Sequence, residues 1–456
     1  MLSPKMHFTG GNMIYLINTF NPHWEGHALP EWTWPKRRIF GYMLKLMDGP
    51  LSLGIGGLRR IGKTTLLKQL VGELNANRAP AKRICYFQFD RDIVLKDDNV
   101  LERVLDAYVL DFLDESIGRI KEKTYIFLDE IQLVPRWSDI VKRYLDRDPA
   151  LTFVVSGSSS LLLESDSAES LAGRLDMLRL SPPDFRDYMT INGLEPPPEF
   201  TIDPNLRKIP TETALFYGAN RSRLTTTYLD YLRWGGFPQL KELDDEESRR
   251  RYIKEVVVEK ILRYDLPARF EGENPIDLEI LYGIYANEYG QIVEYNTLAR
   301  DVGVSVARLK RLTQALMAGY LVQYCFNHTR SKRKSGRTGK KVYLSTPSLA
   351  AHRYGPLDIY PEILGRIVEN DLFLRLREMD AALTFWRVGR QEIDFIFHVQ
   401  DVVIPVECKT GRLRSNDTRL IRSLSEKWGA PFSVMVTSDT FDFSDPSVLR
   451  VPALML

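Results

Sequence analysis

The chain has little cysteine, almost no net charge and no long apolar run. Only three of its 456 residues are cysteine, and Cys85, Cys325 and Cys408 are too widely spaced to indicate a disulfide framework or a zinc site. The formal net charge of +2 excludes a globally basic chain, so contact with nucleic acid would need a local basic patch. The apolar stretches are too short to cross a membrane, and the first residues lack a signal-peptide pattern. We therefore expect a cytoplasmic protein without a membrane partner.

Residues 57–65, GLRRIGKTT, fit the phosphate-binding pattern GxxxxGK[ST]. A short apolar stretch at 51–56 predicts a strand before this loop, and the periodicity from residue 65 onward predicts a helix after it. Glycines let backbone N–H groups turn toward phosphate oxygens, and the helix N-terminus adds its positive end. We expect Lys63 to contact the β- and γ-phosphates of ATP and the Thr64 hydroxyl to hold Mg²⁺. The predicted nucleotide-binding residues are Gly57, Arg60, Gly62, Lys63, Thr64 and Thr65.

A second motif follows one strand and one helix later, where residues 125–130 read YIFLDE. This pattern predicts a buried strand that ends in two carboxylates. We expect Asp129 to bind Mg²⁺ directly or through water, and Glu130 to polarise the attacking water. Two acids after a strand can also cap the next helix, but their position after a phosphate-binding loop favours hydrolysis.

These motifs resemble those of a known family. Together with SGSS at 156–159, LAGR at 171–174, GGFP at 235–238 and KVYL at 341–344, they look like the AAA+-related ATP-binding proteins called archaeal-type ATPases. The resemblance covers nearly the whole chain. It implies a core of parallel strands flanked by helices, then a helical segment, a winged helix and a nuclease-like domain.

The resemblance also suggests further residues for the nucleotide site. In AAA+-type ATPases a polar residue at the tip of the next strand senses the γ-phosphate, which makes Ser158 the candidate, followed by Ser156 and Ser159. These serines could equally cap the following helix. Arg174 could complete the site in its own chain, act as an arginine finger in a neighbouring subunit, or serve as a structural ion-pair partner. Arg174 and the resemblance together allow a homo-oligomer.

Residues 277–349 have the pattern of a winged helix. A helix is predicted at 295–302, a turn follows, and a second helix is predicted from 306 to 317 with Arg308 and Arg311 off its apolar face. The segment 330–341 contains no acidic residue and predicts a basic wing suited to a nucleic-acid backbone. A solvated loop or a protein-docking wing are the alternatives. The predicted nucleic-acid contacts are Arg308, Arg311, Lys332, Arg333, Lys334, Arg337 and Lys340.

The C-terminal region looks like a PD-(D/E)xK nuclease, with Asp394 and the pair Glu407 and Lys409 in the motif positions. Residues two apart on a strand share a face, so Glu407 and Lys409 can meet Asp394 from the neighbouring strand. Two carboxylates would hold Mg²⁺ or Mn²⁺ beside a scissile phosphate, while the lysine orients water and offsets charge. Glu369, on a preceding helix, is either an additional metal ligand or a solvated acid.

The sequence thus predicts an α/β chain with a P-loop NTPase (AAA+-like) parallel sheet core and a C-terminal α/β restriction-endonuclease-like domain. The predicted segments are a lead-in (1–50), an ATPase core (51–195), a helical lid (196–275), a winged helix with a basic wing (276–350) and the nuclease-like domain (355–456). The predicted function is Mg²⁺-dependent ATP hydrolysis acting on nucleic acid, with DNA favoured and a C-terminal domain that binds or cleaves it. The alternative is a nucleotide-switched regulatory or protein-docking ATPase whose nuclease-like domain is inactive.

Overall fold

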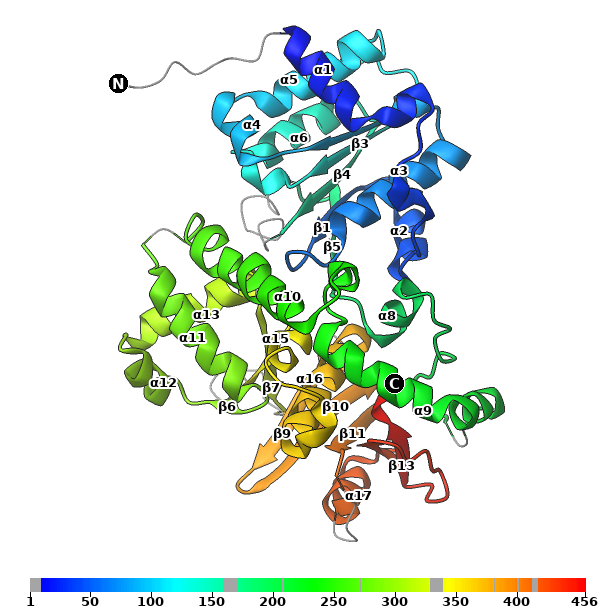
Figure 1. The fold of residues 1–456 in the computed structure, drawn as a ribbon, viewed down its shortest axis with the longest axis vertical. Coiled ribbons are helices and arrows are strands. Elements are labelled where there is room, and N and C mark those ends of the chain that lie inside the picture. Colours follow the sequence, from blue (N-terminus) through cyan, green and yellow to red (C-terminus); the bar gives the residue numbers. More distant parts are fainter. Residues whose placement is uncertain are drawn as a thin grey trace. The chain divides into compact units, whose positions relative to one another are not determined.

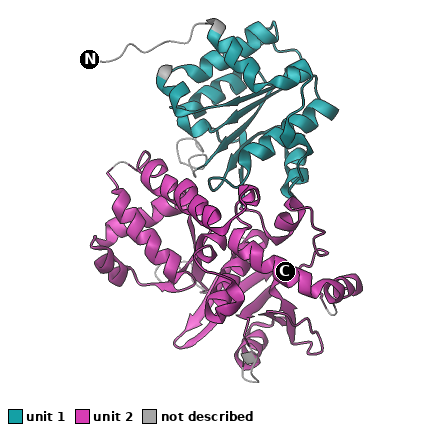
Figure 2. Cartoon of the chain, in the orientation of Figure 1, with its two compact units in different colours: residues 1–181 teal, residues 182–456 magenta. Residues whose placement is uncertain are grey.

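The computed structural model describes residues 10–158, 171–206, 209–270, 272–328, 339–380, 382–399, 402–411 and 417–456. The chain divides into two compact units, Met1–Ser181 and Pro182–Leu456, which Figure 2 shows in different colours. None of the helices in the described part of the chain is long and apolar enough to span a membrane.

Unit 1 is built on a five-stranded parallel sheet with the strand order β2-β3-β4-β1-β5. Its strands β1, β3 and β4 are buried along their whole length, as expected for a parallel sheet covered on both faces. Because the strands are parallel, their carboxyl ends share one edge. The bounds are β1 (Ser52–Gly56), β2 (Ile84–Gln88), β3 (Thr124–Asp129), β4 (Leu151–Gly157) and β5 (Leu175–Arg179).

The helices of unit 1 are labelled around this sheet in Figure 1. They are α1 (Gly10–Phe20), α2 (Ile39–Met47), α3 (Lys63–Asn77), α4 (Arg91–Lys96), α5 (Val100–Ala107) and α6 (Trp137–Arg147), with short turns η1 (Pro22–Glu25), η2 (Pro30–Thr33), η3 (Ala81–Arg83), η4 (Tyr108–Phe112) and η5 (Ile131–Leu133).

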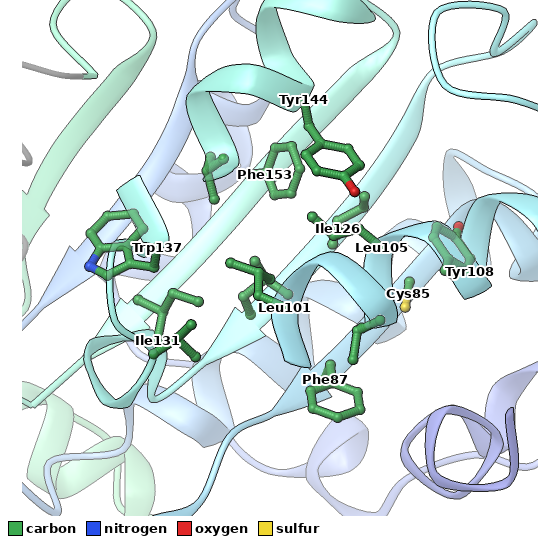
Figure 3. Close-up of a cluster of buried hydrophobic side chains, with 14 of the residues drawn as sticks. Cys85, Phe87, Leu101, Leu105, Tyr108, Ile126, Ile131, Trp137, Tyr144 and Phe153 are labelled. Atoms are coloured by element: carbon green, nitrogen blue, oxygen red, sulfur yellow. The ribbon is translucent and has the colours of Figure 1, made fainter. Parts of the chain in front are cut away.

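Apolar side chains from α5, η4 and α6 pack against strands β2, β3 and β4 to form the core of unit 1 (Figure 3). Helix α5 buries the apolar face of an amphipathic helix, in which residues four apart lie on one side. The buried residues of this face are Val100, Leu101, Val104 and Leu105. Each such side chain that leaves water contributes about 1.5–3 kcal/mol. The cluster includes Cys85, Phe87, Leu101, Leu105, Tyr108, Ile126, Ile131, Trp137, Tyr144 and Phe153.

The segment before β1 lies against the rest of unit 1. The side-chain amide of Asn21 donates a 2.9 Å hydrogen bond to the carbonyl of Tyr86 and accepts a 2.7 Å hydrogen bond from the N–H of Tyr86. These two hydrogen bonds satisfy the N–H and the carbonyl of Tyr86 in β2, which is an edge strand of the sheet. The indole of Trp32 lies so close to Gly72 on α3 that an added Cβ would be 2.6 Å away. Part of the predicted lead-in is therefore integral to this unit.

Unit 2 contains one eight-stranded mixed sheet with the order β13-β12-β11-β10-β9-β7-β8-β6. The sequence divides this region into a winged helix and a nuclease-like domain, yet β7 and β9 pair in parallel and join the two in one sheet. The strands are β6 (Ile292–Val293), β7 (Val322–Asn327), β8 (Lys340–Leu344), β9 (Thr384–Val388), β10 (Gln391–Val399), β11 (Val402–Lys409), β12 (Ser433–Thr437) and β13 (Val448–Pro452).

The helices of unit 2 begin with α8, which the sequence division assigns to the ATPase core. In the structure Phe185 of α8 packs against Tyr228 and Tyr231 of α9, with ring centroids 5.2 and 5.6 Å apart. The helices are α8 (Phe185–Ile191), α9 (Thr211–Trp234), α10 (Glu246–Arg251), α11 (Pro275–Glu288), α12 (Tyr295–Val302), α13 (Val306–Ala318), α15 (Ser348–Ala351), α16 (Pro361–Met379) and α17 (Asp417–Trp428), with π-helical turns η8 (Tyr252–Glu259) and η9 (Ile261–Asp265) and 3-10 turns η7 (Pro238–Glu242), η10 (Leu357–Ile359) and η11 (Ala453–Met455).

A buried polar network joins α9 to α16. The carboxylate of Asp371 is fully buried and accepts hydrogen bonds of 2.7 Å from the hydroxyls of both Tyr228 and Tyr231. The guanidinium of Arg375 donates to Asp371 at 2.6 Å and to the carbonyl of Ala453 at 2.6 Å. The charge of Asp371 is thus paired and hydrogen-bonded, which is the condition for burying a carboxylate at low cost.

Candidate functional site

The phosphate-binding loop connects the carboxyl end of β1 to the first residue of α3. Gly62 caps the helix with a φ of 97°, a left-handed conformation that costs glycine little. At Gly57 an added Cβ would lie 2.5 Å from the carbonyl oxygen of Leu180, just beyond β5, so only glycine fits. Arg60 also has a positive φ of 68°, which turns the backbone within the loop.

Lys63 lies at the start of α3 and is only 5% exposed. Its ammonium donates hydrogen bonds of 2.8 Å to the carbonyl of Gly57 and 2.9 Å to that of Leu58. The loop therefore curves around the lysine. This places a positive charge inside the curve where the sequence predicts phosphate oxygens.

The carboxylate of Asp129, at the end of β3, is the centre of the site and is fully buried. One oxygen accepts hydrogen bonds from the hydroxyls of Thr64, at 2.6 Å, and Tyr86, at 3.0 Å. The other accepts from the hydroxyl of Ser156 and from the N–H of Glu130. Burial and the neighbouring carboxylate raise the pKa of Tyr86, so its phenol remains a donor.

Thr64 and Asp129 together fit a magnesium ion. A hydroxyl and a carboxylate oxygen are hard oxygen donors of the kind Mg²⁺ uses when it also binds nucleotide phosphates. The two oxygens lie 2.6 Å apart, at the edge of the sheet where the loop opens. The fold thus brings together two predicted residues that are 65 positions apart in the chain.

Glu130 follows Asp129 with a φ of 55°, a left-handed conformation that is unfavourable for a residue with a side chain. The side-chain amide of Gln132 contacts both the carboxylate of Glu130 and the hydroxyl of Ser158, the latter at 3.2 Å. Ser158 thus reaches Glu130 through Gln132, while Ser156 contacts Asp129. Ser159 lies outside the described residues.

Two residues of this site have no role in the sequence prediction. Gln132 belongs to the motif segment, but nothing in the sequence shows that its amide joins Glu130 to Ser158. Tyr86 lies on β2, and its contact with Asp129 follows from the pairing of β2 with β3. The alternation of strand residues before the phosphate-binding edge is the one signal that could have pointed to Tyr86.

Arg174 lies at the amino ends of the strands, away from the carboxyl ends where the phosphate-binding loop lies. Its carbonyl accepts a 2.9 Å hydrogen bond from the N–H of Ser52, the first residue of β1, whereas the phosphate-binding loop follows the last residue. Five strand residues span about 16 Å, so a cis role at its own nucleotide does not fit. Its guanidinium instead pairs with Asp146 of α6 at 2.6 Å, and both side chains are partly exposed. This is the structural ion-pair alternative, and an arginine finger could act only on a neighbouring subunit.

A second cluster of charges lies in unit 2. The N–H of Cys408 donates to Asp394 at 2.9 Å, and the N–H of Asp394 lies 3.3 Å from a carboxylate oxygen of Glu407. Lys409 pairs with Glu407 at 2.8 Å. Burial, followed by the charge of Asp394, raises the pKa of Glu407 to about 8. The three predicted motif residues therefore meet where β10 pairs with β11.

Lys341 of β8 enters the same cluster, and the sequence gives it no such role. Its ammonium lies 3.2 Å from Glu369, 2.7 Å from Glu392 and 3.8 Å from Asp394. Burial lowers the pKa of Lys341, but these carboxylates outweigh it and raise the pKa above the usual value. The hydroxyl of Tyr343 donates to the same Glu369 oxygen at 2.6 Å. We call Lys341, Glu369, Glu392, Asp394 and Glu407 the acidic cluster.

The acidic cluster does not fit a metal ion as it stands. Among the residues that the structure describes, no three His, Cys, Asp or Glu side chains are grouped so that they could hold one. The prediction that Glu369, Asp394 and Glu407 form a metal site therefore differs from the structure, in which a lysine ammonium stands among the carboxylates.

The predicted nucleic-acid contacts fall into three groups. Lys332, Arg333, Lys334 and Arg337 lie outside the described residues. Arg308 and Arg311, which the sequence leaves free to contact phosphates, are engaged in ion pairs. Arg308 pairs with Glu273 at 3.3 Å and Asp277 at 2.8 Å, and Arg311 pairs with Glu273 at 3.0 Å. Acids just before and within α11 therefore lie beside these arginines of α13, and a nucleic-acid contact by Arg308 or Arg311, which stays a prediction, would compete with these ion pairs.

Lys340 belongs to a third group, with aromatic neighbours. Its ammonium lies 5.1 to 5.7 Å from the ring centroids of Tyr295, Tyr324 and Phe326, and Lys310 lies 5.6 Å from that of Tyr295. Burial and then the positive charge of Lys310 lower the pKa of Lys340. We call these five half-buried or exposed residues the basic–aromatic patch.

Two family models match parts of the chain. Residues 51–189 match a model described as an AAA domain, and residues 225–356 match a domain of unknown function, DUF8612. The first match covers the parallel sheet, the phosphate-binding loop and Asp129.

Relatives of similar length also match. The uncharacterized protein MJ1544 of Methanocaldococcus jannaschii is 24% identical over 77% of this chain and 73% of its own length. An uncharacterized protein of Haemophilus influenzae is 23% identical over 80% of this chain and 84% of its own. The solved structure of the Aeropyrum pernix ORC1 protein in complex with DNA is 16% identical, covering 76% of this chain and 97% of that one, with a TM-score of 0.28. From the family match and the sheet with its phosphate-binding loop, we conclude that this chain carries an ATP-binding, AAA-type P-loop ATPase domain.

Proposed function

We propose that this protein is a Mg²⁺-dependent ATPase that acts on nucleic acid. The observation that carries the proposal is the hydrogen bond between Thr64 and Asp129, the two residues that we propose as magnesium ligands beside the phosphate-binding loop. A bound Mg²⁺ would neutralise charge on the β- and γ-phosphates. Thr64 and Asp129 would hold it.

Protein groups around this pair have separate tasks in the reaction. Lys63 would bind the phosphates with its ammonium once it leaves the loop carbonyls. Glu130 would accept a hydrogen bond from the attacking water and orient it toward the γ-phosphorus. Gln132 and Ser158 support this orientation because Gln132 contacts both Glu130 and Ser158.

The ATPase proposal is tested by hydrolysis and binding assays on matched variants. Lys63→Ala should lose ATP binding, whereas Glu130→Gln should bind ATP and hydrolyse it about 10²- to 10⁴-fold more slowly. Lys121→Ala and Glu122→Gln, which change exposed residues of the same unit, serve as controls. Undiminished hydrolysis by Glu130→Gln would refute the assigned role.

The nucleic-acid part of the proposal rests on the basic–aromatic patch. Ammonium groups attract phosphates, and exposed ring faces stack on unpaired bases. The patch offers two lysines and three aromatic rings from α12, α13, β7 and β8. Stimulation of ATP hydrolysis by DNA, lost on substituting Lys310 and Lys340, is the expected result. The same rate with and without DNA would remove nucleic acid from the proposal.

The role of the C-terminal domain in this proposal is to bind DNA or to cleave it. Cleavage is tested by incubating linear, circular and branched DNA with Mg²⁺ or Mn²⁺, with and without ATP. A Glu407→Ala/Lys409→Ala variant should lose any cleavage that belongs to this domain.

A second candidate is a nucleotide-switched regulatory or docking ATPase with an inactive nuclease-like domain. The position of Lys341 among the carboxylates favours it, because the acidic cluster then has an internal cation. Intact DNA under every condition, with ATP hydrolysis retained, is the result that this candidate predicts.

A homo-oligomer is also part of the proposal. Arg174 is partly exposed and lies far from its own loop, so a nucleotide contact would require a neighbouring copy. Sedimentation with and without ATP, on wild type and Arg174→Ala, tests this. A monomer at every nucleotide concentration would exclude it.

A further inference from the structure

We propose that Lys341 is an internal counter-cation that takes the place of a divalent metal ion in the acidic cluster. With β8 in its present position, this domain would bind neither Mg²⁺ nor Mn²⁺. The inference concerns unit 2 alone and does not depend on ATP hydrolysis.

The first argument is the position of the ammonium. It lies within 3.2 Å of Glu369, which approaches from α16, and within 3.8 Å of Asp394, which lies on β10. These are two of the three residues that the nuclease-like motif would use for a metal. A magnesium ion needs oxygen ligands at about 2.0–2.1 Å, so it would have to share the space between these carboxylates with a like charge.

The second argument is the burial of Lys341. Its side chain is 3% exposed, and a buried ammonium is stable only when carboxylates surround it. Glu392 completes the set at 2.7 Å. Removing the lysine from this position would leave Glu369 and Asp394 without their shared cation, so the ammonium and the carboxylates stabilise each other.

The third argument is that one carboxylate oxygen of Glu369, Oε1, already accepts two hydrogen bonds. Tyr343 and Lys341 both donate to its Oε1, at 2.6 and 3.2 Å. Both donors lie on β8 two residues apart, so they face the same side of the sheet. A metal ion at this oxygen would have to displace two hydrogen-bond donors that one strand holds in place.

The fourth argument is how β8 reaches the cluster. Strand β8 pairs with β7, and β7 pairs in parallel with β9, so the hairpin is part of the sheet that carries Asp394. Lys340, the preceding residue, faces the basic–aromatic patch on the opposite side. The backbone pairing of β8 with β7 therefore holds Lys341 in the acidic cluster.

The test measures Mn²⁺ binding by electron paramagnetic resonance and the melting temperature with and without Mn²⁺. The variant Lys341→Met/Glu392→Gln removes the ammonium and one carboxylate, so net charge is unchanged and Glu369, Asp394 and Glu407 remain. We expect it to bind one additional Mn²⁺ per chain at least tenfold more tightly than wild type, with a rise in melting temperature. Adding Asp394→Asn should abolish that gain.

Two controls keep the test decisive. Lys341→Arg retains a cation and should bind Mn²⁺ no better than wild type, and Lys340→Met changes the neighbouring lysine on the other face. A folded Lys341→Met/Glu392→Gln protein without the gain would overturn the proposal.

The wild-type chain gives an answer even if the double variant does not fold. Wild type and Asp394→Asn should bind the same amount of Mn²⁺. A loss of Mn²⁺ binding in Asp394→Asn would overturn the proposal. ATP hydrolysis measured on the same samples separates this outcome from a failure of the ATPase proposal, because unit 1 is unchanged.

Discussion

The hydroxyl of Thr64 lies 2.6 Å from a carboxylate oxygen of Asp129, which ties the first turn of α3 to the end of β3. Both residues belong to short motifs, and the hydrogen bond shows that the motifs meet at one edge of the sheet. The oxygen of Asp129 is also bonded to Tyr86, so its orientation is fixed from two sides.

We predict that Thr64→Ala lowers the rate of ATP hydrolysis at least tenfold, because it removes a proposed magnesium ligand and one of the donors to Asp129. Hydrolysis measured over a range of Mg²⁺ concentrations should show that higher Mg²⁺ restores part of the rate. Thr19→Ala removes an exposed hydroxyl from α1 and is the matched control. A Thr64→Ala protein with the wild-type rate and Mg²⁺ dependence would contradict the assignment.

We predict that Lys310→Gln/Lys340→Gln weakens DNA binding and lowers the salt dependence of the binding constant. Each phosphate contact contributes about 0.9 to the slope of log K against log salt concentration, so the slope should fall by about 2. Fluorescence anisotropy between low and moderate salt measures it. Arg308→Gln/Arg311→Gln should leave the slope nearly unchanged, because Glu273 and Asp277 already neutralise these arginines. Equal losses in both variants would show that the ion pairs open on binding.

We predict that Asp371→Ala destabilises unit 2 by about 3–5 kcal/mol, because it leaves Arg375 as a buried charge without its carboxylate. Tyr231→Phe removes one neutral donor to that carboxylate and should cost about 1–3 kcal/mol. Urea unfolding, followed through the transition of unit 2, gives both free energies. Asp358→Ala, at an exposed acid, is the control. A cost for Asp371→Ala no larger than that for Tyr231→Phe would contradict the role of the network.

We predict a pH dependence of stability that originates at His352. The Nδ1–H of its buried ring donates a 2.7 Å hydrogen bond to the carbonyl oxygen of Ser348. Burial, helped by the charges of Arg353 and Arg250, outweighs this bond and lowers the pKa of His352 to about 4. Between pH 6.5 and pH 4 the unfolded chain binds more protons than the native one, so stability is present above pH 6.5 and is lost as the pH falls. The loss attributable to this group at pH 4 is about 3 kcal/mol.

The variant His352→Gln tests this pH dependence. The free energy of unfolding of wild type, relative to His352→Gln, should fall by about 3 kcal/mol from pH 7 to pH 4. His27→Gln removes an exposed histidine and should change the slope little. Parallel pH profiles for wild type and His352→Gln would rule out His352 as the source.

The nucleotide site was largely predictable from the sequence, because its chemistry lies in short segments. A left-handed glycine at position 62 and a carboxylate at the end of a buried strand are local requirements, so Gly62, Lys63, Thr64 and Asp129 can be found without tertiary structure. The contact of Ser156 rather than Ser158 with Asp129 was not predictable. Ser156 and Ser158 are two residues apart, so strand alternation assigns both to one face of the sheet and does not show which of them meets the acid.

The rest depends on contacts between distant segments. Lys341 contacts Glu369 and Asp394 only because β7 pairs with β9, and no local pattern reveals a parallel pairing of that kind. Arg308 and Arg311 lie off the apolar face of their helix in the sequence pattern. In the structure Glu273, 35 residues before Arg308, pairs with both arginines, and Asp277 also pairs with Arg308. Helical periodicity predicts which side of a helix faces outward but does not predict which charges come to lie beside it.

The parallel pairing of β7 with β9 bears on how genes for such chains can recombine. A crossover between β8 and α16 would bring a foreign C-terminal half to this hairpin, and an exposed β9 edge without its partner is prone to aggregate. The incoming half would also need carboxylates matched to Lys341, because an unpaired buried ammonium is costly. We therefore expect the two halves of unit 2 to be inherited as a single block, with insertions and exchanges concentrated outside residues 322–409.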